Sequence, residues 1–223
     1  MPEQSAKYSV ANPGARVRFI TNSATVQVHL AYTNLLQVDD STFNGRGLVL
    51  VNGSTFTTFS QVNPSTQSGN PSSVNSDFTL NFNSSVDRTI EIVMPYMASV
   101  DFLGVTLNSG STIRSAPTRS TTRYVAMGDS ITQGLKSSDP NSWTEILSRT
   151  QNWECVNAGF ATRVCHPEDG TALGNLNPDV ASYMIGYFDY ANQTAPATFK
   201  ANYKAFINNF RAIKPTTKLY CIT

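Results

Sequence analysis

The chain has 223 residues, a formal net charge of +1, 40% hydrophobic residues and only 14% charged residues. A balance this close to neutral provides neither a basic stripe nor an acidic tail, so binding to nucleic acid or another polyanion has no electrostatic support. The length and hydrophobic content allow one or two buried cores, and no apolar run is long enough to cross a bilayer.

Residues 1–118 predict an all-β domain, because short runs of alternating apolar and polar residues are separated by turn signals. One run has its apolar residues at alternate positions: Val26, Val28, Leu30 and Tyr32. His29 falls between them, so we expect it on the polar face of its strand. The pair Asn52-Gly53 is typical of a hairpin turn with positive φ. These features indicate a β-sandwich or jelly roll.

Residues 119–223 predict a separate α/β domain, after a linker rich in Ser, Thr and Arg over 115–122. Four short apolar runs alternate with helical segments, as in a parallel sheet: 124–127, 154–156, 182–185 and 218–222. The first helix begins at a capping box, Ser142 to Glu145, and Trp143, Ile146 and Leu147 form its expected inward stripe. A second helix follows Thr198 and ends before Pro215.

The first apolar run of this domain is followed directly by Gly128-Asp129-Ser130-Ile131-Thr132. A serine at the carboxyl end of a parallel strand lies at the sheet edge where open α/β folds bind ligands, close to the N–H groups of the turn. Ser130 is therefore a candidate nucleophile, and Asp129 beside it is a further candidate for the site. The alternative is a solvent-facing turn in which these residues have only backbone roles.

This motif resembles the first sequence block of the GDSL, or SGNH, family of serine esterases. Residues 153–160 are similar to the second block, a strand ending in Asn-x-Gly, and residues 184–189 to the third, normally Gly-x-Asn-Asp. Residues 88–105 look like part of the amino-terminal β-sandwich of two-domain GDSL carbohydrate and acyl esterases. The resemblance implies a serine esterase that hydrolyses a small ester, with an O-acetyl group on a carbohydrate as the expected substrate.

The resemblance also implies a flavodoxin-like α/β fold. Right-handed crossovers and a nucleophile at the switch point between the first and third strands predict the strand order 2-1-3-4. Such a fold continues with a fifth strand and a terminal helix, so we expect this domain to be incomplete at its carboxyl end. The open sheet edge is then a place where an oligomer could form.

In the family, the oxyanion is held by the serine N–H, a second-block glycine N–H and the third-block Asn side chain. The resemblance thus points to the turn from Gly159 to Thr162, with Thr162 at the position of that glycine. Phe188 occupies the Asn position and has no hydrogen-bond donor, so Asn192 in the following loop is the expected substitute.

The family's general base and its orienting acid lie in an Asp-x-x-His block, which this sequence does not contain. Besides His29 the chain has His166, which follows the second block and could approach the site, although the residue three positions before it is Arg163 rather than an acid. Serine is a weak nucleophile without a base. The sequence therefore predicts a truncated form. The alternative is a non-catalytic glycan-binding or structural module, as in a phage tail, that retains a degenerate esterase scaffold.

No cofactor is expected, and the sequence has no metal-ligand spacing. The three cysteines do not make a disulfide framework; Cys155 and Cys221 are expected in core strands and Cys165 in a loop. The expected partner is a small-molecule or polysaccharide ester, with neither nucleic acid nor a membrane. The sequence begins with no signal peptide, so an extracellular or phage-particle role is an expectation without a targeting signal behind it.

Overall fold

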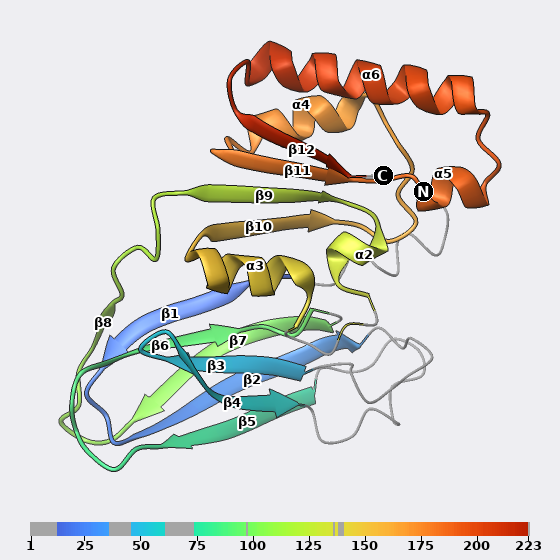
Figure 1. Ribbon diagram of the computed structural model, residues 1–223. Helices are drawn as coiled ribbons and strands as arrows, with labels where there is room; N and C mark the ends of the chain where they lie inside the picture. The colour runs from blue at the N-terminus through green and yellow to red at the C-terminus, as the bar shows by residue number, and fades with distance from the viewer. Residues whose placement is uncertain are drawn as a thin grey trace. The chain divides into compact units, whose positions relative to one another are not determined.

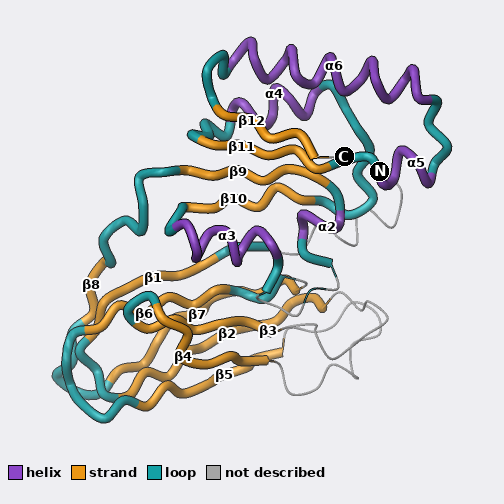
Figure 2. The backbone as a smooth tube through the Cα atoms, viewed as in Figure 1, coloured by secondary structure: helices purple, strands orange, loops and turns teal. Residues whose placement is uncertain are grey.

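The computed structural model describes residues 13–35, 46–60, 74–96, 98–135, 137 and 141–222 (Figures 1 and 2). The chain divides into two compact units, a β unit over residues 7–118 with 136–141 and an α/β unit formed mainly by residues 119–135 and 142–223. Each unit has its own hydrophobic core.

The β unit consists of two antiparallel sheets. The five-stranded sheet has the order β4-β3-β6-β1-β8, with β1 at Arg16–Thr21, β3 at Arg46–Val51, β4 at Ser54–Ser60, β6 at Arg88–Val93 and β8 at Ile113–Ser115. The three-stranded sheet has the order β5-β2-β7, with β2 at Thr25–Leu35, β5 at Val74–Asn81 and β7 at Ala98–Leu107. One core is shared by residues of both sheets, which confirms the predicted β-sandwich.

The alternation in β2 is observed as predicted. Val26, Val28 and Leu30 are fully buried, whereas His29 lies on the opposite face of the strand. There the His29 ring contacts Asp77 Oδ2 at 2.9 Å through Nδ1 and Thr106 Oγ1 at 2.9 Å through Nε2. His29 is thus a cross-strand contact of this sheet.

The α/β unit is built on four parallel strands in the order β10-β9-β11-β12, which confirms the predicted order 2-1-3-4. The strands are β9 at Arg123–Gly128, β10 at Glu154–Gly159, β11 at Val180–Met184 and β12 at Lys218–Ile222. The helices are α2 at Ser130–Gln133, α3 at Trp143–Gln151, α4 at Glu168–Asn175, α5 at Tyr187–Ala191 and α6 at Pro196–Ile213. Figure 1 shows α3 on one face of the sheet and α4 with α6 on the other.

Helix α3 begins where the capping box predicts, since Ser142 Oγ accepts a hydrogen bond from Glu145 N. Its predicted inward stripe is wrong at Ile146, which is 47% exposed. The buried face carries polar residues instead, because β10 and its flanks supply hydrogen-bonding partners. Thr144 Oγ1 accepts from Asn157 Nδ2 at 3.0 Å, and Ser148 Oγ donates to Trp153 O at 2.9 Å.

One expectation for the cysteines is wrong. Cys165 lies in a loop as expected, where it is buried, and burial raises its pKa to about 11. Cys221 is exposed, because β12 is the last strand of the described sheet and its residues are covered on fewer sides than those of a central strand. Cys155 is half-buried.

The described residues contain no helix long and apolar enough to span a membrane. In the same parts of the chain, no group of three or more His, Cys, Asp and Glu side chains is arranged to hold a metal ion.

Helices α4 and α6 pack closely at Gly170. A Cβ atom at this position would lie 2.1 Å from Phe206 O and 2.9 Å from Phe210 N, both backbone atoms of α6. We expect Gly170→Ala to lower the free energy of unfolding by about 2 kcal/mol, because the two helix backbones have to move apart. Urea unfolding followed by tryptophan fluorescence measures this in the α/β unit alone, since the chain has two tryptophans and both, Trp143 and Trp153, belong to that unit.

Gly174→Ala is the matched control in the same helix. The three atoms nearest to a Cβ there belong to the side chain of Ile213, at 3.0 to 3.2 Å, and a small adjustment of Ile213, the last residue of α6, accommodates it. We expect a change below about 1 kcal/mol, because alanine favours the helix and offsets that adjustment. Equal losses for the two variants would show that the close approach of α4 to the α6 backbone is not what requires glycine at Gly170.

Candidate active site

The turns after the first three strands of the parallel sheet meet at one edge. Gly128, the last residue of β9, is in register with Gly159 of β10 and with Met184 of β11. Ser130, the turn 159–162 and the turn 186–189 follow these strand ends directly. The structure therefore brings the three predicted segments to the carboxyl edge of the sheet, where α/β folds place their ligand sites (Figure 1).

The glycines at this edge are required by close packing. A Cβ at Gly128 would lie 2.3 Å from Met184 O, and a Cβ at Gly159 would lie 2.2 Å from Gln133 N. Only a residue without a side chain lets β9 approach the end of β11 and lets β10 approach α2 so closely. These two glycines thus allow α2, which begins at Ser130, to pack closely against the strand ends.

Asp129 fixes the start of α2. Its Oδ1 accepts a hydrogen bond from Ile131 N at 2.9 Å, and its own N–H donates to Met184 O at 3.3 Å. Burial raises the pKa of Asp129, although the Ile131 N–H acts in the opposite direction. Asp129 is therefore the N-cap of the helix that carries Ser130.

Ser130 is the first residue of α2 and is 9% exposed. At this position its backbone N–H has no acceptor within the helix. None of the hydrogen bonds among the described residues involves Ser130 Oγ. The hydroxyl and the N–H therefore lie together at the edge, as a nucleophile and an oxyanion donor of the same residue must.

Three N–H groups of the turn after β10 already donate hydrogen bonds to acceptors in β9, β10 and α2. Gly159 N donates to Asn157 Oδ1 at 2.9 Å, Phe160 N to Gly128 O at 2.9 Å and Ala161 N to Gln133 Oε1 at 2.9 Å. Gly159 therefore contributes close packing at this edge, since its N–H is already engaged. Thr162 has a φ of 68°, a left-handed conformation that favours glycine, at the position where the family has one.

The segment after Thr162 is held by two buried carboxylates, neither of which was among the predicted site residues. Arg163 forms an ion pair and two hydrogen bonds with Asp169, which also accepts from Tyr183 Oη at 2.8 Å. Asp189 Oδ2 accepts from Cys165 N at 2.9 Å. Asp169 and Asp189 are each 4% exposed. For Asp189 a signal existed, because it matches the last Asp of the third block; for Asp169 there was none.

The other predicted site residues are not joined to Ser130 by a contact among the described residues. His166 is exposed, and its carbonyl accepts from Asp169 N at 3.2 Å at the start of α4. Asn192 is exposed at the C-cap of α5, and its N–H donates to Phe188 O at 2.9 Å. Phe188 is half-buried and packs edge-on against Tyr187, with ring centroids 5.1 Å apart.

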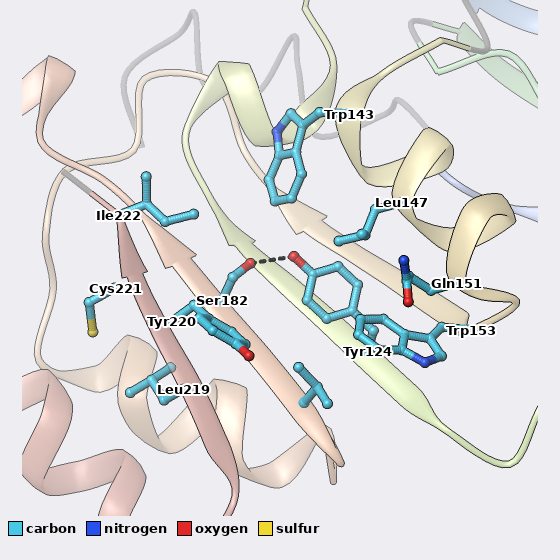
Figure 3. Close-up of a pocket in the computed structure, with 11 residues that line it drawn as sticks. Tyr124, Trp143, Leu147, Gln151, Trp153, Ser182, Leu219, Tyr220, Cys221 and Ile222 are labelled. Atoms are coloured by element: carbon cyan, nitrogen blue, oxygen red, sulfur yellow. Dashed lines mark hydrogen bonds between the residues drawn. The ribbon is translucent and has the colours of Figure 1, made fainter.

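A cavity of about 580 Å³ lies on the face of the sheet rather than at this edge (Figure 3). It is lined by Tyr124, Trp143, Leu147, Gln151, Trp153, Val180, Ser182, Leu219, Tyr220, Cys221 and Ile222. Tyr124 Oη and Ser182 Oγ are joined by a hydrogen bond of 2.6 Å in it, and burial raises the pKa of Tyr124 to about 12. None of the predicted site residues lines this cavity.

Comparison with known proteins agrees with the geometry of the edge. Residues 126–223 match the model of the GDSL-like lipase/acylhydrolase family. The α/β unit is therefore similar in sequence to this family over less than half of the chain, and the matched residues include Ser130 in the Gly-Asp-Ser motif at the carboxyl edge. A search of curated proteins found no match to the sequence.

Several solved structures have a similar fold over nearly the whole chain. The salicylyl-acyltransferase SsfX3 from a tetracycline biosynthetic pathway is 20% identical with a TM-score of 0.78, and the match covers 98% of this chain and 62% of that one. A candidate GDSL-like lipase from Bacteroides ovatus is 18% identical with a TM-score of 0.78, with 99% and 64% covered. A family two carbohydrate esterase from Clostridium thermocellum is 16% identical with a TM-score of 0.71, with 95% and 71% covered.

At these identities the likeness establishes the fold alone. The chain spans less than two thirds of the length of the first two of these proteins. All three matches extend over the β unit as well as the α/β unit.

Proposed function

We propose that the α/β unit is the catalytic domain of a serine esterase and that Ser130 is its nucleophile. The observation that supports this best is the position of Ser130, at the first residue of α2, on the sheet edge to which three strand ends bring their turns. In the proposed reaction, Ser130 Oγ attacks the ester carbonyl carbon, the alcohol leaves, and water then hydrolyses the acyl-serine.

The proposed oxyanion donors are the backbone N–H groups of Ser130 and Thr162. The left-handed backbone of Thr162 supports its assignment, since it reproduces the conformation of the glycine that the family has there. Asn192 is the proposed third donor in place of the missing Asn, because its amide is exposed close to α5. This donor requires a rotation of the Asn192 side chain toward the edge.

The general base is the catalytic group for which the described residues offer the weakest candidate. His166 is the histidine of the α/β unit, and it has no described contact with Ser130. Without a base, Ser130 Oγ remains a protonated and weak nucleophile. We therefore expect this chain to hydrolyse its substrate slowly, because removal of the Ser130 proton limits the rate.

The proposed substrate is an O-acetyl ester on a carbohydrate. Two features support this choice. The chain has few charged residues, which suits a neutral substrate, and its fold resembles that of a family two carbohydrate esterase. A small acyl group also needs the least space in a site where the bulky Phe188 replaces the Asn of the family.

Added imidazole tests this proposal, because it supplies the missing base without changing the protein. We expect the release of acetate from acetylated xylooligosaccharides to be slow and to rise with imidazole concentration, after subtraction of the rate with imidazole alone. Alkyl esters suit the test because imidazole itself attacks them slowly. If no acetate is released either with or without imidazole, the proposal that this unit is an esterase is wrong.

The second candidate is a non-catalytic glycan-binding module that retains the esterase scaffold. Phe188 favours it, since replacing an oxyanion donor costs about 3 kcal/mol of transition-state stabilisation. This candidate predicts saccharide binding with no acetate release at any imidazole concentration.

The edge of β12 is a proposed surface for self-association, because β12 has a neighbour on one side only in the described sheet. Sedimentation velocity over a range of protein concentrations tests whether a second copy covers it.

A further inference from the structure

Helix α5 exposes two tyrosine rings on one side. Tyr187 is 62% exposed and Tyr190 is 86% exposed, and they lie one helical turn apart. Asp189, between them in sequence, points the other way and is buried. Tyrosines this exposed contribute little to a core, so a pair on one helix face is typical of a binding surface.

The helix that carries them is firmly held. On its buried side, Asp189 Oδ2 accepts from Cys165 N at 2.9 Å, and Asp189 O accepts from Thr194 N at 2.8 Å. The turn before α5 has a φ of 134° at Gly186, a conformation that favours glycine. The ring of Tyr187 is also supported by the edge-on contact with Phe188. The two tyrosines therefore require little further ordering to bind a ligand.

The helix that carries the pair begins at the same edge of the sheet as the proposed nucleophile. Met184 ends β11, and its carbonyl accepts the hydrogen bond from Asp129 N at 3.3 Å. Helix α5 begins three residues later, at the same edge of the sheet as α2 (Figure 1). A ligand stacked on α5 would thus lie at the sheet edge that also carries Ser130.

The chain segment around the pair is polar and carries no exposed charge. From Ile185 to Phe199 the only charged side chain is the buried Asp189. The exposed neighbours are the amide side chains of Asn192 and Gln193. Aromatic faces stack on the C–H face of a sugar ring, and amides hydrogen-bond its hydroxyl groups. Residues 185–199 contain no Lys or Arg that could pair with an acidic ligand.

We infer that Tyr187 and Tyr190 form a stacking platform for a neutral saccharide at the sheet edge that carries Ser130. Its relation to catalysis rests on the proposed function of Ser130, but saccharide binding itself requires no turnover. The platform holds the sugar that carries the ester and so determines which class of alcohol is accepted.

Isothermal titration calorimetry with neutral hexasaccharides, xylohexaose and cellohexaose, tests this inference in a Ser130→Ala background. We expect at least one of them to bind, and Tyr187→Ala and Tyr190→Ala each to raise its Kd about fivefold, the typical effect of losing one aromatic contact. Tyr220→Ala is the matched control, since Tyr220 is 56% exposed on β12 of the same unit. It should leave the Kd unchanged.

Three results would overturn the inference. These are no binding of either neutral hexasaccharide, unchanged affinity in both α5 variants, or equal loss in the Tyr220→Ala control. A shift in sedimentation coefficient on mutation of Tyr187 or Tyr190, without an effect on saccharide binding, would assign the pair to contact with a second copy of the chain. Unchanged acetate release in Ser130→Ala, with normal saccharide affinity, would reject the nucleophile and leave the platform standing.

Discussion

Ser130→Ala is expected to remove the release of acetate from acetylated xylooligosaccharides, with and without imidazole, to below about 1% of the rate of the unchanged chain. The reason is that the substitution deletes the hydroxyl that we propose as the nucleophile and that would carry the acyl group. The fold should survive, because Ser130 Oγ takes part in none of the hydrogen bonds among the described residues. Acetate release, measured enzymatically at matched protein concentration, gives the comparison.

Ser54→Ala is the control for this prediction, since Ser54 is exposed on β4 in the other unit. Its rate should equal that of the unchanged chain. If Ser130→Ala retains that rate as well, the nucleophile is assigned wrongly.

His166→Ala completes the set of activity variants. Exposure of His166 and its lack of a described contact with Ser130 predict that its removal changes the rate little. A fall of orders of magnitude, restored by imidazole, would instead identify His166 as the base.

Asp169→Ala should have the largest effect on stability, lowering the free energy of unfolding of the α/β unit by about 3 kcal/mol. Asp169 is 4% exposed and holds both Arg163 and the hydroxyl of Tyr183. Its loss leaves a largely buried guanidinium and a buried hydroxyl without their acceptor. Urea unfolding followed by fluorescence of Trp143 and Trp153 measures the effect.

Glu168→Ala is the matched control for Asp169→Ala, because Glu168 is the exposed carboxylate next to it in the first turn of α4. It should cost less than about 0.5 kcal/mol. The double variant Arg163→Ala with Asp169→Ala should lose less than the sum of the two single changes, since each single change breaks the same pair. Additive losses would mean that the ion pair is not the source of the stability.

The sequence predicted the parts of the fold that follow from local pattern and from chain geometry. Apolar runs marked all four parallel strands, and right-handed crossovers fixed their order. The capping box gave the start of α3 at Ser142. The same motif could not predict which face of α3 turns inward. Thr144 accepts a hydrogen bond from Asn157, and Ser148 donates one to the Trp153 carbonyl, so a polar face that hydrophobic periodicity assigns to solvent is buried.

The sequence predicted the site residues whose position follows from the ends of the strands. It did not predict those whose position depends on hydrogen bonds and ion pairs between side chains. Ser130 and the two following turns were placed at one edge by the motif and the strand order. Arg163 and Asp169 have no such signal, since nothing in their local sequence shows that they pair across a turn under Tyr183. The N–H of Gly159 is another example, because its acceptor is a side chain that sequence pattern does not orient.

The most direct test of the assignment is the site of covalent labelling by a fluorophosphonate, located by tandem mass spectrometry of the digested protein in the presence of imidazole. A phosphonate transfers to a serine only where the hydroxyl can attack and the developing charge is held, so it reports both parts of the proposed site. We expect one adduct per chain, on Ser130. A protein that remains unlabelled, or an adduct on any other residue with Ser130 unmodified, would contradict the assignment.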